Sequence, residues 1–351
     1  MSVDRFTDIG QFRNVIRSVA DRTRFDGFDG DGNVILKTVV DMPKITFNGT
    51  VKLHGTNASC GFDNDGEIFY QSRRSVITIE NDNAGFAFFA NSKKDTFNGW
   101  YDDIKTRLNI IDSSIIFFGE WCGGNIQKGV SINGLEKMFV LFAVKIVPND
   151  VEESSYYLYR DEWKELNDVD NLIFNINDFE SFKIEIDFNN PKMSQNKIVE
   201  LVEVVEKECP VGKAFGRVLD KDCTIGEGIV WVGWYDGQRY VFKTKGDKHS
   251  ISKVKTVAPV DVEKLNSINE FVDYAVTENR LNQAIEQVFT INNIRPDIKK
   301  TGDYIRWVIT DIIKEEIDVM VENKLEPKDV NKHISTSARK WFFKFLDEME
   351  Y

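Results

Sequence analysis

The chain has 351 residues, enough for two domains or for one large domain with an appendage. Apolar residues make up 42% of it, charged residues 29%, and only 7 residues are proline, a composition that excludes disorder over most of the length. The formal net charge of −12, taken as an average, disfavours a nucleic-acid partner, because phosphate-binding proteins usually have a basic balance.

No apolar stretch of the kind found in secretory signal peptides occurs near the N-terminus. The longest apolar run, near 138–147, is interrupted by Lys145 and covers about half of a membrane span. The 4 cysteines form no CxxC pair, so neither a zinc site nor a disulfide framework is expected. We therefore expect a protein of the reducing cytoplasm, or of the host cytoplasm if it is viral, with no membrane contact.

Residues 34–147 are expected to form mainly strands and turns. Runs on either side of the Asn-Asp-Gly turn at 64–66 predict a pair of strands. Short runs of β-branched and aromatic residues at 113–121 and 137–147 predict buried strands.

Residues 151–210 contain 15 acidic and 6 basic residues, so this segment carries −9 of the net charge. We expect a solvated insertion with a helix at 194–208, lying away from the path of any nucleic acid. The clearest hairpin follows at 226–245, where two alternating runs flank an Asp-Gly turn at 236–237.

From about Val260 the spacing of apolar residues becomes helical, and Ser335 or Thr336 is a candidate cap for the last helix. The predicted helices lie at 264–289, 301–324 and 335–351. We therefore predict two domains, a β-rich one at 1–258 that contains the acidic insertion at about 151–210, and an all-helical one at 259–351.

The most informative stretch is Lys52-Leu53-His54-Gly55-Thr56-Asn57. A lysine close to a glycine is common in solvated turns, and this one gains meaning from the motifs that follow it in a fixed order. They are Phe118-Gly119-Glu120, the apolar run Met138 to Ile146, Glu227-Gly228-Ile229-Val230 and Lys243-Thr244-Lys245.

A lysine amine can attack the α-phosphate of a nucleoside triphosphate and hold the nucleotide as a phosphoramidate. Lys243 and Lys245 alternate along the predicted strand, so both side chains point to the same face. There they can present two ammonium groups to the phosphates and favour the neutral, nucleophilic form of Lys52.

The order of these motifs resembles that of the covalent nucleotidyltransferases, which are the polynucleotide ligases and mRNA-capping enzymes. Within that superfamily the chain is most similar to the RNA ligase 2 family, which includes phage double-strand RNA ligases and RNA-editing ligases. The similarity lies in the KxHGTN motif, in GEWCGGNIQKGV and in the tail containing HISTSARKWFF. It implies an α+β fold, with a nucleotidyltransferase (ATP-grasp-like ligase) domain of antiparallel sheets and flanking helices, followed by an all-helical C-terminal domain that engages RNA.

The resemblance implies that Lys52 carries AMP and that Glu120 accepts hydrogen bonds from the ribose hydroxyls, as a carboxylate can. It implies that Glu227 holds the catalytic Mg²⁺, or Mn²⁺ in its place, which needs few protein carboxylates beside phosphate oxygens. It also implies an aromatic residue stacked on adenine, which is Phe142, with the neighbouring Phe139 as the alternative.

One arginine after the strand that is predicted to end at residue 70 is expected to contact phosphate. Arg74 fits the family pattern better, and a slip of one residue would put Arg73 in its place. His54 and Asn57 belong to the HGTN turn, where His54 orients the loop or touches a phosphate, and Gly55 permits the tight turn.

The residue before the lysine is Val51, where this family usually has a glutamate associated with reading adenine, and this departure leaves the preference for ATP less secure. The helical tail holds basic residues that can bind the RNA backbone without sequence specificity, or form a solvated face. They are Lys328, Lys332, Arg339, Lys340 and Lys344.

We predict a monomeric, ATP-dependent polyribonucleotide ligase for RNA repair. It would seal 3′-hydroxyl and 5′-phosphate ends, at nicks in duplex RNA or RNA-containing hybrids, through lysyl-AMP and an adenylylated RNA 5′ end. The predicted catalytic residues are Lys52, Glu227, Lys243 and Lys245. The predicted nucleotide-binding residues are His54, Gly55, Asn57, Arg74, Glu120, Phe142, Lys243 and Lys245. The alternatives are a GTP-using capping-type guanylyltransferase and a non-catalytic RNA-binding protein on a ligase scaffold.

Overall fold

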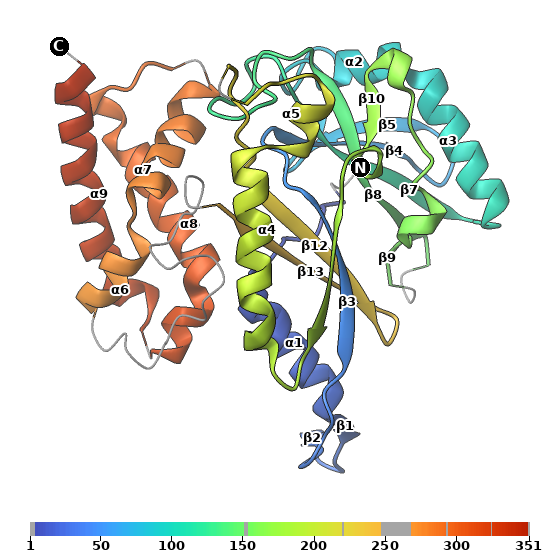
Figure 1. Cartoon of the computed structure of the whole chain (residues 1–351), viewed down its shortest axis with the longest axis horizontal. Coiled ribbons are helices and arrows are strands. Elements are labelled where there is room, and N and C mark those ends of the chain that lie inside the picture. The colour runs from blue at the N-terminus through green and yellow to red at the C-terminus, as the bar shows by residue number, and fades with distance from the viewer. Residues whose placement is uncertain are drawn as a thin grey trace. The chain divides into compact units, whose positions relative to one another are not determined.

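The computed structural model describes residues 4–150, 154–219, 221–246, 268–292, 294–323 and 325–349 (Figure 1). Internal contacts divide the chain into two compact units. Unit 1 is built from Met1–Ile9, Phe47–Lys183 and Val204–Tyr240, and unit 2 from Gly10–Thr46, Ile184–Glu203 and Val241–Tyr351. The predicted domain boundary at 258/259 lies outside the described residues, so a division at that point stays a prediction.

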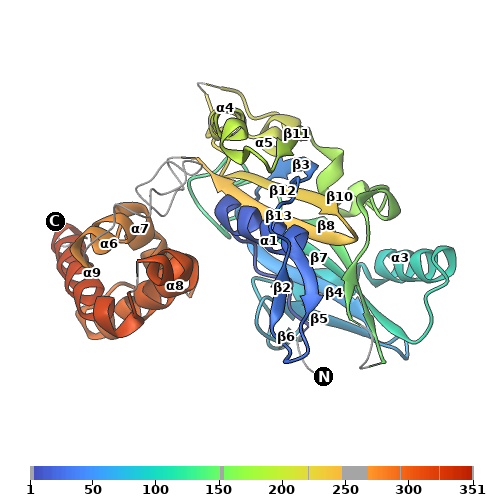
Figure 2. The same cartoon turned by 90° about the horizontal axis from the view of Figure 1, so that it is seen from below.

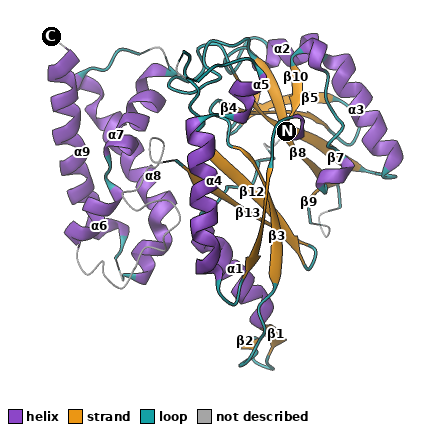
Figure 3. Ribbon diagram, in the orientation of Figure 1, coloured by secondary structure: helices purple, strands orange, loops and turns teal. Residues whose placement is uncertain are grey.

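Strands and helices alternate irregularly along the chain (Figure 3). The strands are β1 Phe25–Phe28, β2 Val34–Leu36, β3 Lys44–Val51, β4 Thr56–Phe62, β5 Ile68–Ser72, β6 Val76–Ile77, β7 Ser113–Cys122, β8 Met138–Pro148, β9 Tyr156–Tyr157, β10 Ile173–Asn175, β11 Phe182–Asp187, β12 Gly228–Tyr235 and β13 Gln238–Lys245. The α-helices are α1 Phe12–Arg24, α2 Phe86–Ser92, α3 Lys94–Arg107, α4 Gln195–Lys207, α5 Pro210–Ala214, α6 Ile268–Ala275, α7 Glu278–Ile285, α8 Thr301–Glu322 and α9 Pro327–Met349.

The larger sheet has 7 strands in the order β10-β8-β7-β4-β5-β6, with β9 added to β8. Its pairs are antiparallel except that β10 runs parallel to β8. The strands predicted around the turn at 64–66 are β4 and β5, and those predicted at 113–121 and 137–147 are β7 and β8. The predicted fold class, α+β with antiparallel sheets and a helical C-terminal region, is therefore confirmed.

Aromatic side chains from the helices cover one face of the larger sheet. In α3, the ring of Phe97 lies 5.8 Å from that of Phe139, and Trp100 lies 5.5 Å from Phe117. Phe86 of α2 lies 5.3 Å from Phe139 on the same face. Phe139 is therefore fully buried between sheet and helices.

The N-terminal segment, residues 4–9, lies against the opposite face of the larger sheet. The ring of Phe6 packs 5.3 Å from that of Phe118 and 5.0 Å from that of Phe142. Asp4 forms an ion pair with Lys145 on β8. Phe142 is thus on the face of Phe118, away from the helices that cover the first face.

The smaller sheet has 4 strands in the order β11-β3-β12-β13. The predicted hairpin at 226–245 is confirmed as β12 and β13. Its turn residues Asp236 and Gly237 have φ values of 50° and 69°, and two positive φ values in succession are what a two-residue hairpin turn requires. Along β13, Phe242 and Thr244 are buried, while Lys243 and Lys245 alternate with them, which confirms that the two lysines share a face.

The structure corrects the expectation that residues 151–210 form a solvated insertion. Strands β9 and β10 extend the larger sheet and β11 joins the smaller one. The predicted helix at 194–208 is α4, and its Ile198, Val202 and Val205 are buried. The acidic side chains alternate with apolar ones that enter the core. The net charge of the segment therefore gave no indication that its apolar side chains are buried.

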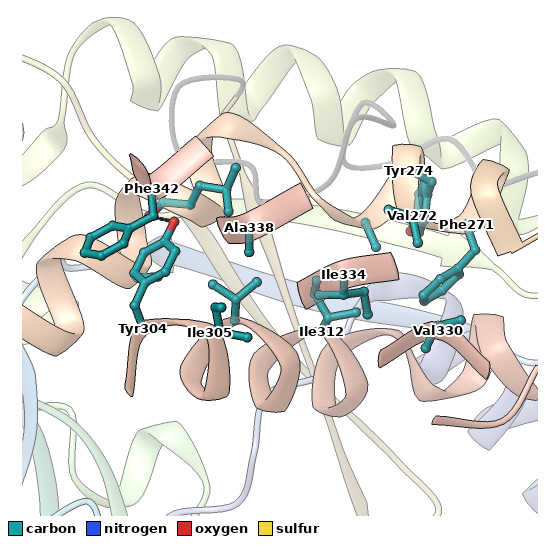
Figure 4. Packing of buried hydrophobic residues seen from close by; sticks show 14 of the residues in the cluster. Phe271, Val272, Tyr274, Tyr304, Ile305, Ile312, Val330, Ile334, Ala338 and Phe342 are labelled. Atoms are coloured by element: carbon teal, nitrogen blue, oxygen red, sulfur yellow. Dashed lines mark hydrogen bonds between the residues drawn. The ribbon is translucent and has the colours of Figure 1, made fainter. Parts of the chain in front are cut away.

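Helices α6 to α9, seen end-on in Figure 2, enclose a core of their own. Phe342 of α9 stacks on Tyr304 of α8 with 4.4 Å between ring centroids, and Ile334 and Ile312 continue the contact between the two helices (Figure 4). No described helix combines the length and hydropathy needed to span a lipid bilayer.

The predicted start of the last helix at Ser335 or Thr336 is wrong, because α9 begins at Pro327. Ser335 Oγ donates to the carbonyl of Asn331 at 2.7 Å, and Thr336 Oγ1 donates to that of Lys332 at 2.9 Å. Both hydroxyls thus bond back to the preceding turn inside the helix, as serine and threonine do there.

Candidate active site

The register between β3 and β12 places Lys52 beside Glu227. Val51, the last residue of β3, lies opposite Ile229, and the backbone N–H of Lys52 donates to the carbonyl of Gly228 at 2.8 Å. Lys52, the first residue after β3, is therefore next to Glu227, the last residue before β12. Sheet pairing alone brings these two distant motifs together.

A short ion pair joins the two side chains. Lys52 Nζ lies 2.7 Å from Glu227 Oε2, and His54 Nδ1 lies 3.2 Å from the same oxygen. The carboxylate of Glu227 is only 2% exposed, while the Lys52 side chain is 22% exposed. A buried carboxylate is costly unless it is paired, so Lys52 and His54 stabilise its ionised form.

Glu120 of β7 faces the same turn. The backbone N–H of Gly55 donates to Glu120 Oε1 at 2.9 Å, and Asn57 lies directly opposite Glu120 in the β4–β7 pair. Burial raises the pKa of Glu120 to about 7; Lys52 opposes this rise, and the negative charge of Glu227 adds to it. Lys52, His54, Gly55, Asn57, Glu120 and Glu227, all named from the sequence, are thus gathered within unit 1.

Gly55 must be glycine because of the space around it. A Cβ atom built there would lie 2.4 Å from the carbonyl oxygen of Trp121 and 2.7 Å from Cys122 Cβ. The turn can therefore approach the end of β7 only without a side chain.

Gln127 is a member of this site that sequence reasoning did not single out. Its side chain is 5% exposed, and its Nε2 donates to the carbonyl of Gly55 at 3.3 Å. Gln127 belongs to the Gly-rich GGNIQK stretch, but its burial against Gly55 is a property of the fold that the sequence does not display. Gln127 thus bonds to the carbonyl of Gly55, while Glu120 accepts from the N–H of the same residue.

The aromatic and arginine candidates lie elsewhere in unit 1. Phe139 is buried under α2 and α3, whereas Phe142 is partly exposed on the face that carries Phe118 and Glu120 of β7. Arg73 and Arg74 are exposed in the turn after β5, which ends at Ser72 and not at residue 70. Arg73 pairs with Asp8 at 2.5 Å, so its guanidinium is engaged with the N-terminal segment.

Lys243 and Lys245 belong to unit 2. The Nζ atom of Lys243 lies 3.0 Å from Glu315 Oε2 on α8. That these lysines join Lys52 around one nucleotide stays a prediction.

The donor set fits a divalent metal that is shared with a nucleotide. Mg²⁺ keeps few protein carboxylates and completes its octahedron with phosphate oxygens and water. Glu227 supplies a carboxylate beside Lys52. Among the described residues, no cluster of three or more His, Cys, Asp or Glu side chains could hold a metal ion alone. The metal, like the nucleotide, would therefore be held jointly by protein and substrate.

A buried carboxylate beside a lysine, where β3 of the smaller sheet leads into β4 of the larger one, forms a candidate nucleotidyltransferase site. Residues 45–245, more than half of the chain, match the family model described as RNA ligase, so the chain belongs to the RNA ligase family. This confirms, at the level of the family, the resemblance inferred from the motifs.

Among solved structures, the chain is similar to those of an RNA ligase from Naegleria gruberi. One is a lysine-to-alanine variant with ATP and manganese, with 17% identity and a TM-score of 0.41. Another is the protein with pyrophosphate, with 17% identity and a TM-score of 0.42. Each match covers 70% of this chain and 56% of that chain, so this chain matches little more than half of that protein. The search of curated proteins found no match.

Proposed function

We propose that the protein is an ATP-dependent RNA ligase that joins a 3′-hydroxyl to a 5′-phosphate through AMP bound to Lys52. The observation that carries this proposal is the 2.7 Å contact between Lys52 Nζ and the buried carboxylate of Glu227, in a chain of the RNA ligase family. A nucleophilic amine beside a metal-binding carboxylate is the arrangement that attack on a triphosphate requires.

The reaction would run in three steps. The Lys52 amine attacks the α-phosphorus of ATP, a P–N bond forms, and pyrophosphate leaves. The RNA 5′-phosphate then attacks the same phosphorus and takes AMP from Lys52, giving a 5′-5′ pyrophosphate. Finally the 3′-hydroxyl attacks the RNA phosphorus, AMP leaves, and the phosphodiester forms.

Each side chain of the proposed site would have a separate role in binding the nucleotide or stabilising its phosphates. Glu120 would accept hydrogen bonds from the ribose hydroxyls, and Phe142 would stack on adenine. Lys243 and Lys245 would neutralise phosphate charge, together with one phosphate-binding arginine, for which Arg74 is proposed. A divalent metal held by Glu227 and phosphate oxygens would add electrostatic stabilisation of the pentavalent phosphorus.

Incubation with ATP labelled at the α-phosphate tests the proposal. The wild-type protein should become covalently labelled in the presence of Mg²⁺, and Lys52→Ala should not. Absence of label in wild type, or equal label in Lys52→Ala, would contradict the mechanism. RNA binding without any label would favour the non-catalytic alternative.

Nucleotide choice needs a separate competition. Val51 is 3% exposed and pairs with Ile229 in the sheet, so the position before the lysine offers no acidic group to adenine. We expect ATP to be preferred through stacking on Phe142 and backbone acceptors. Preferential labelling with GTP would favour the capping-type alternative.

The proposed substrate is a nick in duplex RNA or in an RNA-containing hybrid, engaged by the helical region at 259–351 of a monomeric enzyme. The exposed basic side chains of α9 support this, because they suit a phosphate backbone. Parallel ligation of single-stranded, nicked-duplex and hybrid substrates tests it; faster sealing of single strands would contradict it.

A further inference from the structure

A glutamate of the helical region holds one of the lysines assigned to phosphate binding. Lys243 Nζ lies 3.0 Å from Glu315 Oε2 and 3.1 Å from Oε1, so the ammonium group bridges both carboxylate oxygens. The two side chains are 18% and 16% exposed, and both belong to unit 2. This ion pair is largely shielded from water and therefore from screening by salt.

Other cations in unit 2 act on the same carboxylate. Burial by itself raises the pKa of Glu315, but Lys243, Lys245 and Arg280 together hold that pKa below its ordinary value. Glu315 is therefore an anion at neutral pH, and its negative charge interacts with both lysines of β13, Lys243 and Lys245.

Helix α8 is fixed at this point by two arginines. The guanidinium of Arg280, fully buried, donates to Glu316 Oε1 at 3.1 Å and to Asp311 Oδ2 at 2.9 Å. Arg13 of α1 donates to Glu316 Oε2 at 3.0 Å and to the carbonyl of Glu315 at 3.3 Å. The backbone at Glu315 is thus held in place, and the contact with Lys243 is not that of a mobile surface side chain.

We propose that Glu315 competes with the nucleotide phosphates for Lys243 and so acts as a built-in brake on self-adenylylation. The inference rests on the proposed function, since it requires that Lys243 bind phosphate. When the ammonium group of Lys243 moves to bind a phosphate, it leaves Glu315. The Glu315 carboxylate then loses this ion pair while it stays shielded from water, which is unfavourable. Phosphate binding by Lys243 and the ion pair between Lys243 and Glu315 of α8 therefore oppose each other: each weakens the other by the same free energy.

Self-adenylylation of the full-length protein, without RNA, tests the brake. Labelling rates are measured over a range of ATP concentrations for wild type, Glu315→Gln and Asp303→Asn. Glu315→Gln keeps the shape of the side chain and removes its charge. Asp303 lies near the start of α8 and pairs with Lys300 and Arg306 at 3.3 Å, so its variant controls for the loss of an exposed carboxylate from the same helix.

Glu315→Gln should lower the KM for ATP by about tenfold while the rate at saturating ATP stays close to that of wild type. A merely structural role would leave KM unchanged or reduce the saturating rate. Asp303→Asn should match wild type in both parameters, and an equal fall of KM in Asp303→Asn would overturn the proposal.

An unchanged or higher KM in Glu315→Gln, with a thermal melt like that of wild type, would overturn the brake and leave the ligase mechanism intact. If Glu315→Gln is unfolded at the assay temperature, Glu315→Asp decides, because its shorter side chain withdraws the carboxylate and must also lower KM. Absence of label in wild type is a different result and refutes the proposed function itself.

Discussion

The carboxyl group of Glu120 changes its charge near neutral pH, because burial raises its pKa to about 7 against the opposing charge of Lys52. A raised pKa means that Glu120 is largely neutral below pH 7 and ionised above it. Only the ionised form presents acceptors on both oxygens to a pair of ribose hydroxyls. Ribose binding should therefore strengthen as the pH rises through 7.

Adenosine isolates this effect, because it carries the ribose hydroxyls but no titrating phosphate. We expect its affinity to rise about fivefold between pH 6 and pH 8, the difference between neutral and charged hydrogen bonds. Calorimetry or NMR titration measures it. Glu120→Gln, which stays neutral, should show a flat profile, and an equal rise in that variant would refute the assignment.

The close contacts around Gly55 predict that replacing this glycine with alanine lowers the rate of self-adenylylation. A methyl group there meets the Trp121 carbonyl at 2.4 Å, so Gly55→Ala must displace the turn that orients Lys52 and Glu120. Self-adenylylation should fall by about 10- to 100-fold, as expected for overpacking of 1–3 kcal/mol. Gly99 of α3 is the matched control, because nothing lies within 4 Å of its Cβ position. Gly99→Ala should label like wild type and melt at the same or a higher temperature, and equal losses in both variants would contradict the argument.

Single residues of the site were predictable from the sequence to different degrees. Lys52, Glu120 and Glu227 stand in motifs whose chemistry is recognisable without coordinates. Gln127 was missed because its importance is its burial against Gly55, and no local pattern encodes burial of an amide. Glu315 was missed for a related reason: its partner Lys243 lies 72 residues away, in a different kind of element.

At the scale of elements, three different signals identified the strands. Alternation of apolar residues identified β12 and β13, the runs beside the turn at 64–66 identified β4 and β5, and short runs of β-branched and aromatic residues identified β7 and β8, which are buried almost throughout. The start of α9 was misplaced by choosing a serine over a proline. Pro327 is preorganised for the first helical turn and gives up no hydrogen bond there, so it is the stronger start signal. The segment 151–210 was wrongly predicted to be a solvated insertion. Its acidic side chains are on the exposed faces, and its net charge contains no information about the apolar side chains that are buried on the other faces.

Adjacent phenylalanines of α9 have opposite environments, which gives a matched pair of variants. Phe342 is fully buried and stacks on Tyr304 at 4.4 Å, whereas Phe343 is 38% exposed. Phe342→Ala should destabilise the helical core by about 3–5 kcal/mol through the cavity it leaves, and Phe343→Ala should cost about 1 kcal/mol or less. Chemical denaturation monitored by circular dichroism checks this, and similar midpoints for the two variants would contradict the packing described.

At the scale of the whole molecule, the net charge of −12 is compatible with RNA binding because charges are distributed unevenly. Arg339 and Lys340 of α9 are exposed, whereas Lys164 lies in the acidic segment and pairs with Asp161 at 2.9 Å. We predict that the acidic segment lies off the RNA path and that α9 lies on it.

Salt dependence of RNA affinity tests that prediction. Arg339→Gln and Lys340→Gln should each weaken binding of nicked duplex RNA and reduce the slope of log K against log salt by about 1. Lys164→Gln should change neither quantity. A reduced slope in Lys164→Gln would place the acidic segment on the RNA path.

The ion pair between Lys52 and Glu227 has a consequence for the enzyme outside its own reaction. Cells contain acyl phosphates, thioesters and aldehydes that modify exposed amines, and an amine selected for covalent chemistry is their natural target. An ammonium group held by a buried carboxylate is a poor nucleophile, so we expect Lys52 to resist such adventitious modification while no nucleotide is bound. The contact on which we base the proposed role of Lys52 would thus also protect that amine while the site is empty.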